Sequence, residues 1–217
     1  MKRFFSPSLR QRLAPHSRQR SRVYCGLLVA GSLLVAGLGE VAPQPFRKAA
    51  TATPDAQIAR AGEPWQIASF PVEGFQAYTS AFGYRGSSFH YCLDIASPSG
   101  SYIRNWWEGR VVEVSDDSAC GTSVIIESGD WTHVYCHMQG YVTYEGGTRV
   151  FVDSGGGLRL AEGQGVATGD RIGRVGMTGR TTGPHLHWGM RYQGNWVDPA
   201  LVLQAMSDGQ RRAALPQ

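Results

Sequence analysis

Short runs of β-branched and aromatic residues, separated by glycine every few positions, make up most of the chain from Phe70 onward. Glycine supplies the backbone conformations that tight turns require, whereas valine, isoleucine and tyrosine fit the pleated surface of a strand. The chain has 217 residues, of which 28 are glycine, and this length suffices for one domain with its own core. The pattern therefore predicts a mainly β domain with many turns.

Alternating apolar patterns predict strands over residues 109–114, 185–192 and the two arms of a hairpin, 123–127 and 132–138. The turn of this hairpin is expected at Ser128–Asp130, and residues 148–160 are expected to form a second, looser hairpin. The segment DPALVLQAM, residues 198–206, predicts a short helix with Asp198 as its cap.

The first 39 residues differ from the rest. They carry seven basic side chains and no acidic one, and an apolar run covers Val23–Leu38. A run of 16 residues is short for a bilayer core of about 30 Å, and it follows a basic segment as in a secretory signal. Residues 1–39 are therefore predicted to be a signal peptide or a signal anchor, and both alternatives stay open. In either case the remainder is exported to the periplasm or cell envelope, and residues 23–38 would supply any membrane attachment.

Outside this leader the chain carries 14 basic and 17 acidic residues, so its overall positive charge gives no reason to expect nucleic acid as a partner. Residues 40–69 are rich in Pro, Ala, Thr and Gln and are expected to be a linker. The predicted domain then covers residues 70–205, and residues 206–217 form a polar tail.

Export permits disulfides, and three cysteines follow the leader: Cys92, Cys120 and Cys136. Cys120 and Cys136 flank the predicted hairpin, so their backbones should run close together. We expect them to be paired, with a stabilisation of about 3 kcal/mol in the chain-entropy model. A Cys92–Cys136 pair is the alternative.

Histidines recur in three short patterns: HYCLD at 90–94, YCH at 135–137 and HLH at 185–187. On a strand, residues i and i+2 share a face, so His185 and His187 can reach one site. His90 and Asp94 would lie about 13 Å apart on a regular strand, too far for one metal ion, so the chain must bend between them. Two nitrogens and one carboxylate oxygen form a three-ligand zinc set with an open fourth position, as in catalytic zinc sites.

The segments FGYRGSSFHYCLDIASPSG, HVYCHM and GVATGDRIGRVGMTGRTTGPHLHW resemble the lysostaphin/LytM-type family of zinc endopeptidases, which cut the cross-link peptides of peptidoglycan. The resemblance covers residues 78–203. It implies a small antiparallel β-sheet domain with long loops around a groove and a short C-terminal helix.

The family pattern H-x-x-x-D…H-x-H further implies one zinc ion held by His90, Asp94 and His187. It implies that His137 and His185 are the catalytic histidines and that Arg85 faces the developing oxyanion. The expected protein is thus a zinc metalloendopeptidase that acts, as a monomer, on peptidoglycan peptides. A non-catalytic module of the same fold, which binds and regulates a cell-wall hydrolase, is the main alternative, and a zinc-stabilised binding protein is the third.

The chain departs from the family pattern in three places. Cys92 stands where the family usually has a bend-forming glycine, and it could be an extra ligand. The segment Val142–Leu160 is an insertion that we expect to form a hairpin shaping the groove. Trp106 and Trp107 replace small residues and could face either the substrate or the core. His133 lies about 13 Å from His137 on the same predicted strand, so we expect it to be a surface residue at the hairpin tip and no ligand.

Overall fold

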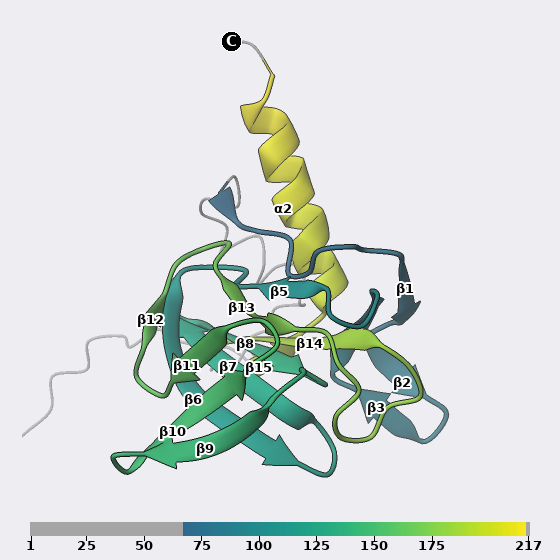
Figure 1. Cartoon of the computed structure of the whole chain (residues 1–217). Coiled ribbons are helices and arrows are strands. Elements are labelled where there is room, and N and C mark those ends of the chain that lie inside the picture. The colour runs from purple at the N-terminus through teal and green to yellow at the C-terminus, as the bar shows by residue number, and fades with distance from the viewer. Residues whose placement is uncertain (1–66, 216–217) are drawn as a thin grey trace, which may run out of the picture. The chain divides into compact units, whose positions relative to one another are not determined.

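The computed structural model describes residues 67–215 (Figure 1). These described residues all belong to one compact unit. The predicted leader and residues 40–66 of the predicted linker lie outside the described residues. Within 67–215, no helix is long and apolar enough to cross a membrane.

An eight-stranded antiparallel sheet forms the centre of the domain, with the strand order β1-β4-β14-β8-β7-β6-β12 and with β15 paired to β14. Its strands are β1 (Ala77–Ser80), β4 (Cys92–Ala96), β6 (Gly109–Asp117), β7 (Gly121–Ser128), β8 (Trp131–Cys136), β12 (Gly165–Val166), β14 (His185–Tyr192) and β15 (Asn195–Val197). The predicted strands over 109–114 and 185–192 are confirmed, the first with three more residues. The predicted hairpin is β7 and β8, joined through Gly129 and Asp130.

Three smaller sheets surround this centre. They comprise β9 (Tyr141–Glu145) with β10 (Thr148–Asp153) and β11 (Leu158–Ala161), β5 (Tyr102–Arg104) with β13 (Arg171–Arg174), and β2 (Gly83–Arg85) with β3 (Ser88–His90). The looser hairpin predicted within 148–160 is confirmed as β10 and β11, and β9 adds a third strand to it.

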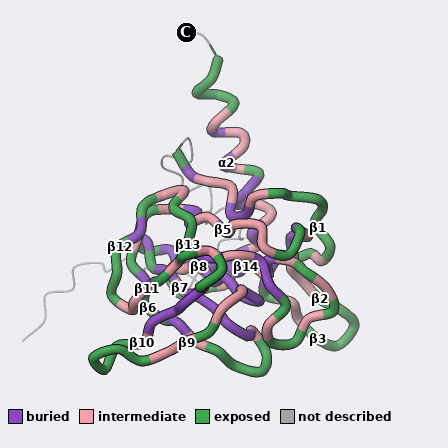
Figure 2. The backbone as a smooth tube through the Cα atoms, in the orientation of Figure 1, coloured by how far each residue is buried: buried purple, intermediate pink, exposed green. Residues whose placement is uncertain are grey.

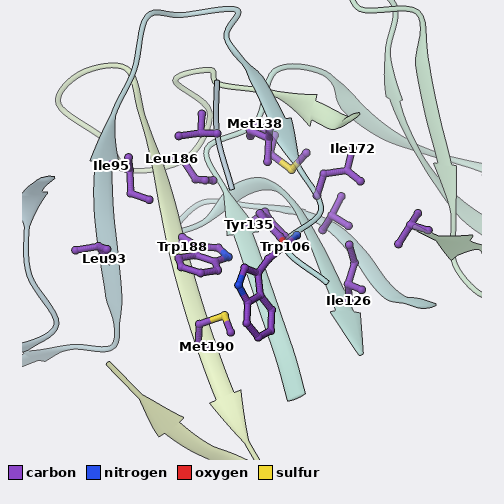
Figure 3. Close-up of a cluster of buried hydrophobic side chains, with 14 of the residues drawn as sticks. Leu93, Ile95, Trp106, Ile126, Tyr135, Met138, Ile172, Leu186, Trp188 and Met190 are labelled. Atoms are coloured by element: carbon purple, nitrogen blue, oxygen red, sulfur yellow. The ribbon is translucent and has the colours of Figure 1, made fainter. Parts of the chain in front are cut away.

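The core lies on one face of the large sheet. Leu186, Trp188 and Met190 alternate along β14 and are all fully buried, as the two-residue period of a strand requires when one face is covered (Figure 3). Tyr135 of β8 and Trp106, from the segment before β6, pack beside them. Trp106 is therefore a core residue, and Trp107 packs half-buried against the same cluster.

The helix α2 (Pro199–Ala213) is longer than predicted. The Asp198 side chain accepts a hydrogen bond from the Ala200 N–H, so the predicted cap is confirmed. The helix continues through Gly209, which is buried, and the Gln210 side chain donates to the Ala68 carbonyl at 2.9 Å. These contacts extend the helix into residues expected to form a tail, and its last residues, 211–213, are exposed (Figure 2).

Cys120 and Cys136 form a disulfide, with their Cα atoms 5.1 Å apart, so the predicted pairing is confirmed. Cys92 is free and buried. The bridge joins the turn before β7 to the end of β8, where the histidine of the YCH pattern follows. The Cys120 carbonyl also accepts a hydrogen bond from the His137 N–H at 2.8 Å.

Candidate functional site

The three central strands β4, β14 and β8 bring the histidine patterns together. His187 of β14 lies directly opposite Asp94 of β4 on one side and Cys136 of β8 on the other. His185, two residues before His187, shares its face, whereas Leu186 points into the core. Sheet register alone therefore places both histidines of HLH beside the predicted carboxylate.

His90 reaches this group because the chain is not a continuous strand between His90 and Asp94. β3 ends at His90 and β4 begins at Cys92, with Tyr91 between them outside either strand. The expected bend is thus present. It brings the His90 Nε2 atom to 3.4 Å from the Asp94 Oδ1 atom, far closer than a regular strand would allow.

His90, Asp94 and His187 form a group that can hold a metal ion. The His187 Nδ1 atom lies 2.6 Å from Asp94 Oδ1 and 3.3 Å from His90 Nε2. Ligand atoms bound tetrahedrally to zinc at 2.0–2.1 Å lie about 3.3 Å from one another. Two of the three separations already match that value, and the third requires only a small outward movement.

The hydrogen bonds of His90 involve Nδ1 and leave Nε2 available to bind a metal ion. Its Nδ1 atom lies 2.8 Å from the Ala81 carbonyl oxygen and 2.5 Å from a guanidinium nitrogen of Arg85, so Nδ1 is occupied by these two groups. The other ring nitrogen, Nε2, is the one that faces Asp94. A backbone carbonyl behind a ligating histidine is the usual arrangement in metal sites. The donor set of two imidazoles and one carboxylate suits zinc.

His137 and His185 lie beside this group, with ring centroids 4.8 Å apart. The Nδ1 atom of His137 lies 2.8 Å from the Thr178 carbonyl, and that of His185 lies 2.8 Å from the Gly183 carbonyl. Both rings therefore donate through Nδ1 and keep a free lone pair on Nε2. Together with His187 they form a second group within metal-binding distance, so the geometry alone offers two alternative ligand sets.

His137 owes its position to an unusual backbone. Its φ is +60°, in the left-handed region that a non-glycine residue rarely adopts. The strand β8 ends there, and the His137 carbonyl accepts a hydrogen bond from the Gly176 N–H at 2.8 Å. A side chain on Gly176 would fall within 3 Å of that carbonyl oxygen and of the Gln139 nitrogen, so this approach needs glycine. Strained residues of this kind cluster at functional sites.

Burial and charge shape the titration of the group. Burial lowers the pKa of His90 and of His137 below the usual histidine value, so both are neutral at pH 7. Burial opposes ionisation of Asp94, but the hydrogen bond from His187 and the surrounding histidines hold the pKa of this carboxyl below its usual value. Neutral imidazoles and an ionised carboxylate are the states that bind metal.

A cavity of about 510 Å³ opens over these side chains. It is lined by all six predicted site residues, His90, Asp94, His137, His185, His187 and Arg85, and also by Ala119, Cys120, Arg180, Thr181 and Thr182. Arg180 is not among the site residues predicted from the sequence, although it lies only five residues before His185 in MTGRTTGPHLH. The insertion Val142–Leu160 contributes no residue to this lining. The expectation that it shapes the groove is therefore wrong for this cavity.

Arg85 lies at the edge of the cavity with 45% of its side chain exposed. One of its guanidinium nitrogens lies 3.4 Å from Asp94 Oδ2, the carboxylate oxygen that does not face His187. Arg85 thus forms an ion pair with Asp94 through the carboxylate oxygen that His187 leaves free.

Cys92 belongs to neither metal-binding group among the described residues. Its side chain is buried near Gly189 and Trp196, away from the cavity lining. Burial raises the pKa of this thiol to about 12, which disfavours the thiolate that zinc requires. The extra-ligand alternative therefore has no support in the structure.

The prediction that His133 is a surface residue is wrong. The side chain is fully buried, on the core face of β8 with Tyr135. The Ser128 hydroxyl donates to the Trp107 carbonyl at 3.3 Å, so its oxygen accepts from His133 Nε2–H at 2.8 Å. The Tyr135 hydroxyl then donates to His133 Nδ1 at 2.9 Å. Both ring nitrogens are satisfied, and His133 is no metal ligand.

This buried histidine predicts acid sensitivity. Burial lowers the pKa of His133 from 6.5 to about 3, so the unfolded chain binds the extra proton between these values. The free energy of unfolding should therefore be highest above pH 6.5 and fall as the pH drops toward 3, by up to about 1.4 kcal/mol per pH unit from this residue. In His133→Gln, which cannot titrate, denaturant unfolding between pH 7 and 4 with chelator present should show a shallower pH dependence. Equal slopes in the two proteins would contradict this assignment.

The family model described as peptidase family M23 matches residues 88–199. The DD-carboxypeptidase/endopeptidase Mpg of Neisseria meningitidis is 30% identical over 131 residues, which are 57% of this chain and 26% of that protein. The peptidoglycan DD-endopeptidase ShyA of Vibrio cholerae is 31% identical over 110 residues, 50% of this chain and 22% of that protein. The chain thus spans about a quarter of the length of these curated relatives.

Among solved structures, a variant of the catalytic domain of the prophage-encoded M23 protein EnpA of Enterococcus faecalis is 27% identical. The match covers 62% of this chain and 95% of that one, with a TM-score of 0.48.

Proposed function

Because the chain belongs to peptidase family M23, we propose that it is an active, zinc-dependent endopeptidase that hydrolyses peptide cross-links of bacterial peptidoglycan. The single observation that carries this proposal is the pair His137 and His185 beside a complete His-Asp-His set. A purely structural metal site would not need two further histidines with free lone pairs directed at the same cavity. ShyA, which is named a peptidoglycan DD-endopeptidase, supports the substrate class, and Mpg, which is named a DD-carboxypeptidase/endopeptidase, supports the reaction.

His90, Asp94 and His187 would hold the zinc ion. We prefer this set to His137, His185 and His187 because it includes a carboxylate and has separations close to those of a tetrahedral zinc site. When bound, zinc would supply Lewis acidity, which polarises the scissile carbonyl and lowers the pKa of the attacking water.

The two remaining histidines, His137 and His185, would then transfer protons. Each is held by a backbone carbonyl at Nδ1, so its Nε2 can accept a proton from the attacking water and return it to the leaving amine. The low pKa of His137 keeps it neutral and ready to accept at neutral pH. Arg85 would keep Asp94 oriented, and its charge lies close enough to the cavity to favour a developing oxyanion.

Digestion of purified peptidoglycan tests this function. The protein should convert cross-linked muropeptides into uncross-linked ones with new amino termini, detected by mass spectrometry. A chelator should abolish the reaction, and added zinc should restore it. Binding to peptidoglycan without cleavage, with zinc present, would instead support the non-catalytic regulatory module.

The proposal also requires the protein to reach peptidoglycan, so we propose that it is exported. The basic segment and the apolar run Val23–Leu38 support this, and the disulfide between Cys120 and Cys136 is typical of an oxidising compartment.

A further inference from the structure

Arg180 lies on the loop between β13 and β14, at the rim of the cavity that holds the histidines. The residue is exposed, and its guanidinium makes no hydrogen bond or ion pair with any residue in the range 67–215. An arginine in this position presents a permanent positive charge to whatever enters the cavity.

The backbone beneath Arg180 is held firmly. Its N–H donates to the Ala119 carbonyl at 3.0 Å. The Thr178 hydroxyl accepts from the Thr122 N–H and donates to the Met138 carbonyl, both at 2.9 Å. These bonds fix Thr178 and Arg180 to the turn before β7, to β7 itself and to Met138, the residue after His137.

The packing at Gly179 fixes the loop further. Its φ is +71°, and a Cβ on this residue would lie 2.3 Å from the Gly121 nitrogen, so the two backbones touch directly. The loop can therefore approach the disulfide-linked turn only with glycine at this point. The backbone of Arg180, the next residue, is thus held in a fixed position.

The charges around the cavity leave Arg180 without an acidic partner from the described chain. Asp94 is the only carboxylate among the lining residues, and Arg85 and His187 already engage both of its oxygens. Arg85 and Arg180 thus differ: the first neutralises a residue of the site, and the second faces the cavity with its charge uncompensated. Arg180 is therefore available to pair with an anionic group of the substrate.

We propose that Arg180 is a substrate-positioning residue that binds an ionised carboxylate of the peptide, close to the bond that is cut. The proposal rests on the proposed peptidase function and deepens it, because it names the chemical class of substrate as a peptide with a free carboxylate at that position. The planar guanidinium can pair with both carboxylate oxygens and so fix the orientation of the peptide as well as attract it.

Two synthetic cross-linked peptides provide the test, identical except that one carries a free carboxylate beside the scissile bond and the other a carboxamide. The wild-type protein should prefer the carboxylate by about 10- to 100-fold in kcat/KM, mostly through KM, since a charge-assisted paired contact is lost in the amide. Arg180→Ala should lose this factor on the carboxylate peptide and change little on the amide. Arg180→Lys, which keeps the charge but not the fork, should retain part of the preference.

Zinc content should be unchanged in both variants, and Arg212→Ala, at an exposed position of α2, should behave like the wild type. If the wild-type protein cuts both peptides equally well and Arg180→Ala does the same, the inference about Arg180 is wrong while the peptidase function stands. If the preference survives in Arg180→Ala but is lost in Arg85→Ala, Arg85 binds the carboxylate and the inference is again overturned. If the wild-type protein cuts neither peptide nor purified peptidoglycan, the proposed function itself fails.

Discussion

Replacing Asp94 with alanine is expected to remove zinc and hydrolysis together. Asp94 supplies the only carboxylate of the proposed ligand set, and it lies within 3.4 Å of the ligand nitrogens of both His90 and His187. Its loss also leaves these imidazoles and Arg85 without their shared negative partner. We expect zinc content to fall from one equivalent to near zero, with peptidoglycan hydrolysis reduced to background.

Metal analysis and hydrolysis assays on one preparation measure this effect. Asp116→Ala, which removes a carboxylate on β6 away from the cavity, is the matched control and should keep both zinc and activity. His90→Ala and His187→Ala should behave like Asp94→Ala. An Asp94→Ala protein with a full equivalent of zinc would exclude the carboxylate from the metal site.

Replacing His185 or His137 with alanine should separate catalysis from metal binding. Neither histidine belongs to the proposed ligand set, so zinc should stay near one equivalent. Turnover should fall by about 10²–10⁴-fold, because each variant lacks a group that accepts or returns a proton. The His137 variant places alanine at the same positive φ and loses the hydrogen bond to the Thr178 carbonyl, so its folding should be checked by thermal unfolding.

The contrast between His185→Ala and His187→Ala decides between the two ligand sets, since both histidines come from the same strand. Loss of zinc in His185→Ala and in His137→Ala, with zinc retained in Asp94→Ala, would support the set of three histidines. Near-native turnover in both His185→Ala and His137→Ala would contradict a hydrolytic role for them.

The strands of the fold could be predicted well because their signals are local. HLHWGMRY alternates strictly between cavity-facing and core-facing residues as far as Trp188, and its predicted bounds match β14. The end of α2 could not be predicted in this way. Gly209 favours a helix end in isolation, whereas here tertiary packing buries it and the Gln210 side chain bonds to Ala68, far away in sequence.

The orientations of the histidine side chains, like the end of α2, could not be predicted from local sequence signals. A regular strand would place His137 on the core face with His133 and Tyr135, and only the positive φ at His137 turns it toward the cavity. Nothing in the sequence signals that torsion angle. The burial of His133 likewise depends on Trp106, which packs against it from a distant segment. The motifs could indicate which residues form the site, but not the register that places His187 opposite Asp94.

The position of zinc in crystals of the zinc-loaded protein, measured by anomalous scattering at the zinc absorption edge, tests the proposed metal site most directly. We expect one peak about 2.0–2.2 Å from the His90 Nε2, Asp94 Oδ1 and His187 Nδ1 atoms, with His137 and His185 outside bonding distance. A peak bonded to His137, His185 and His187, or no ordered peak at this site, would contradict it.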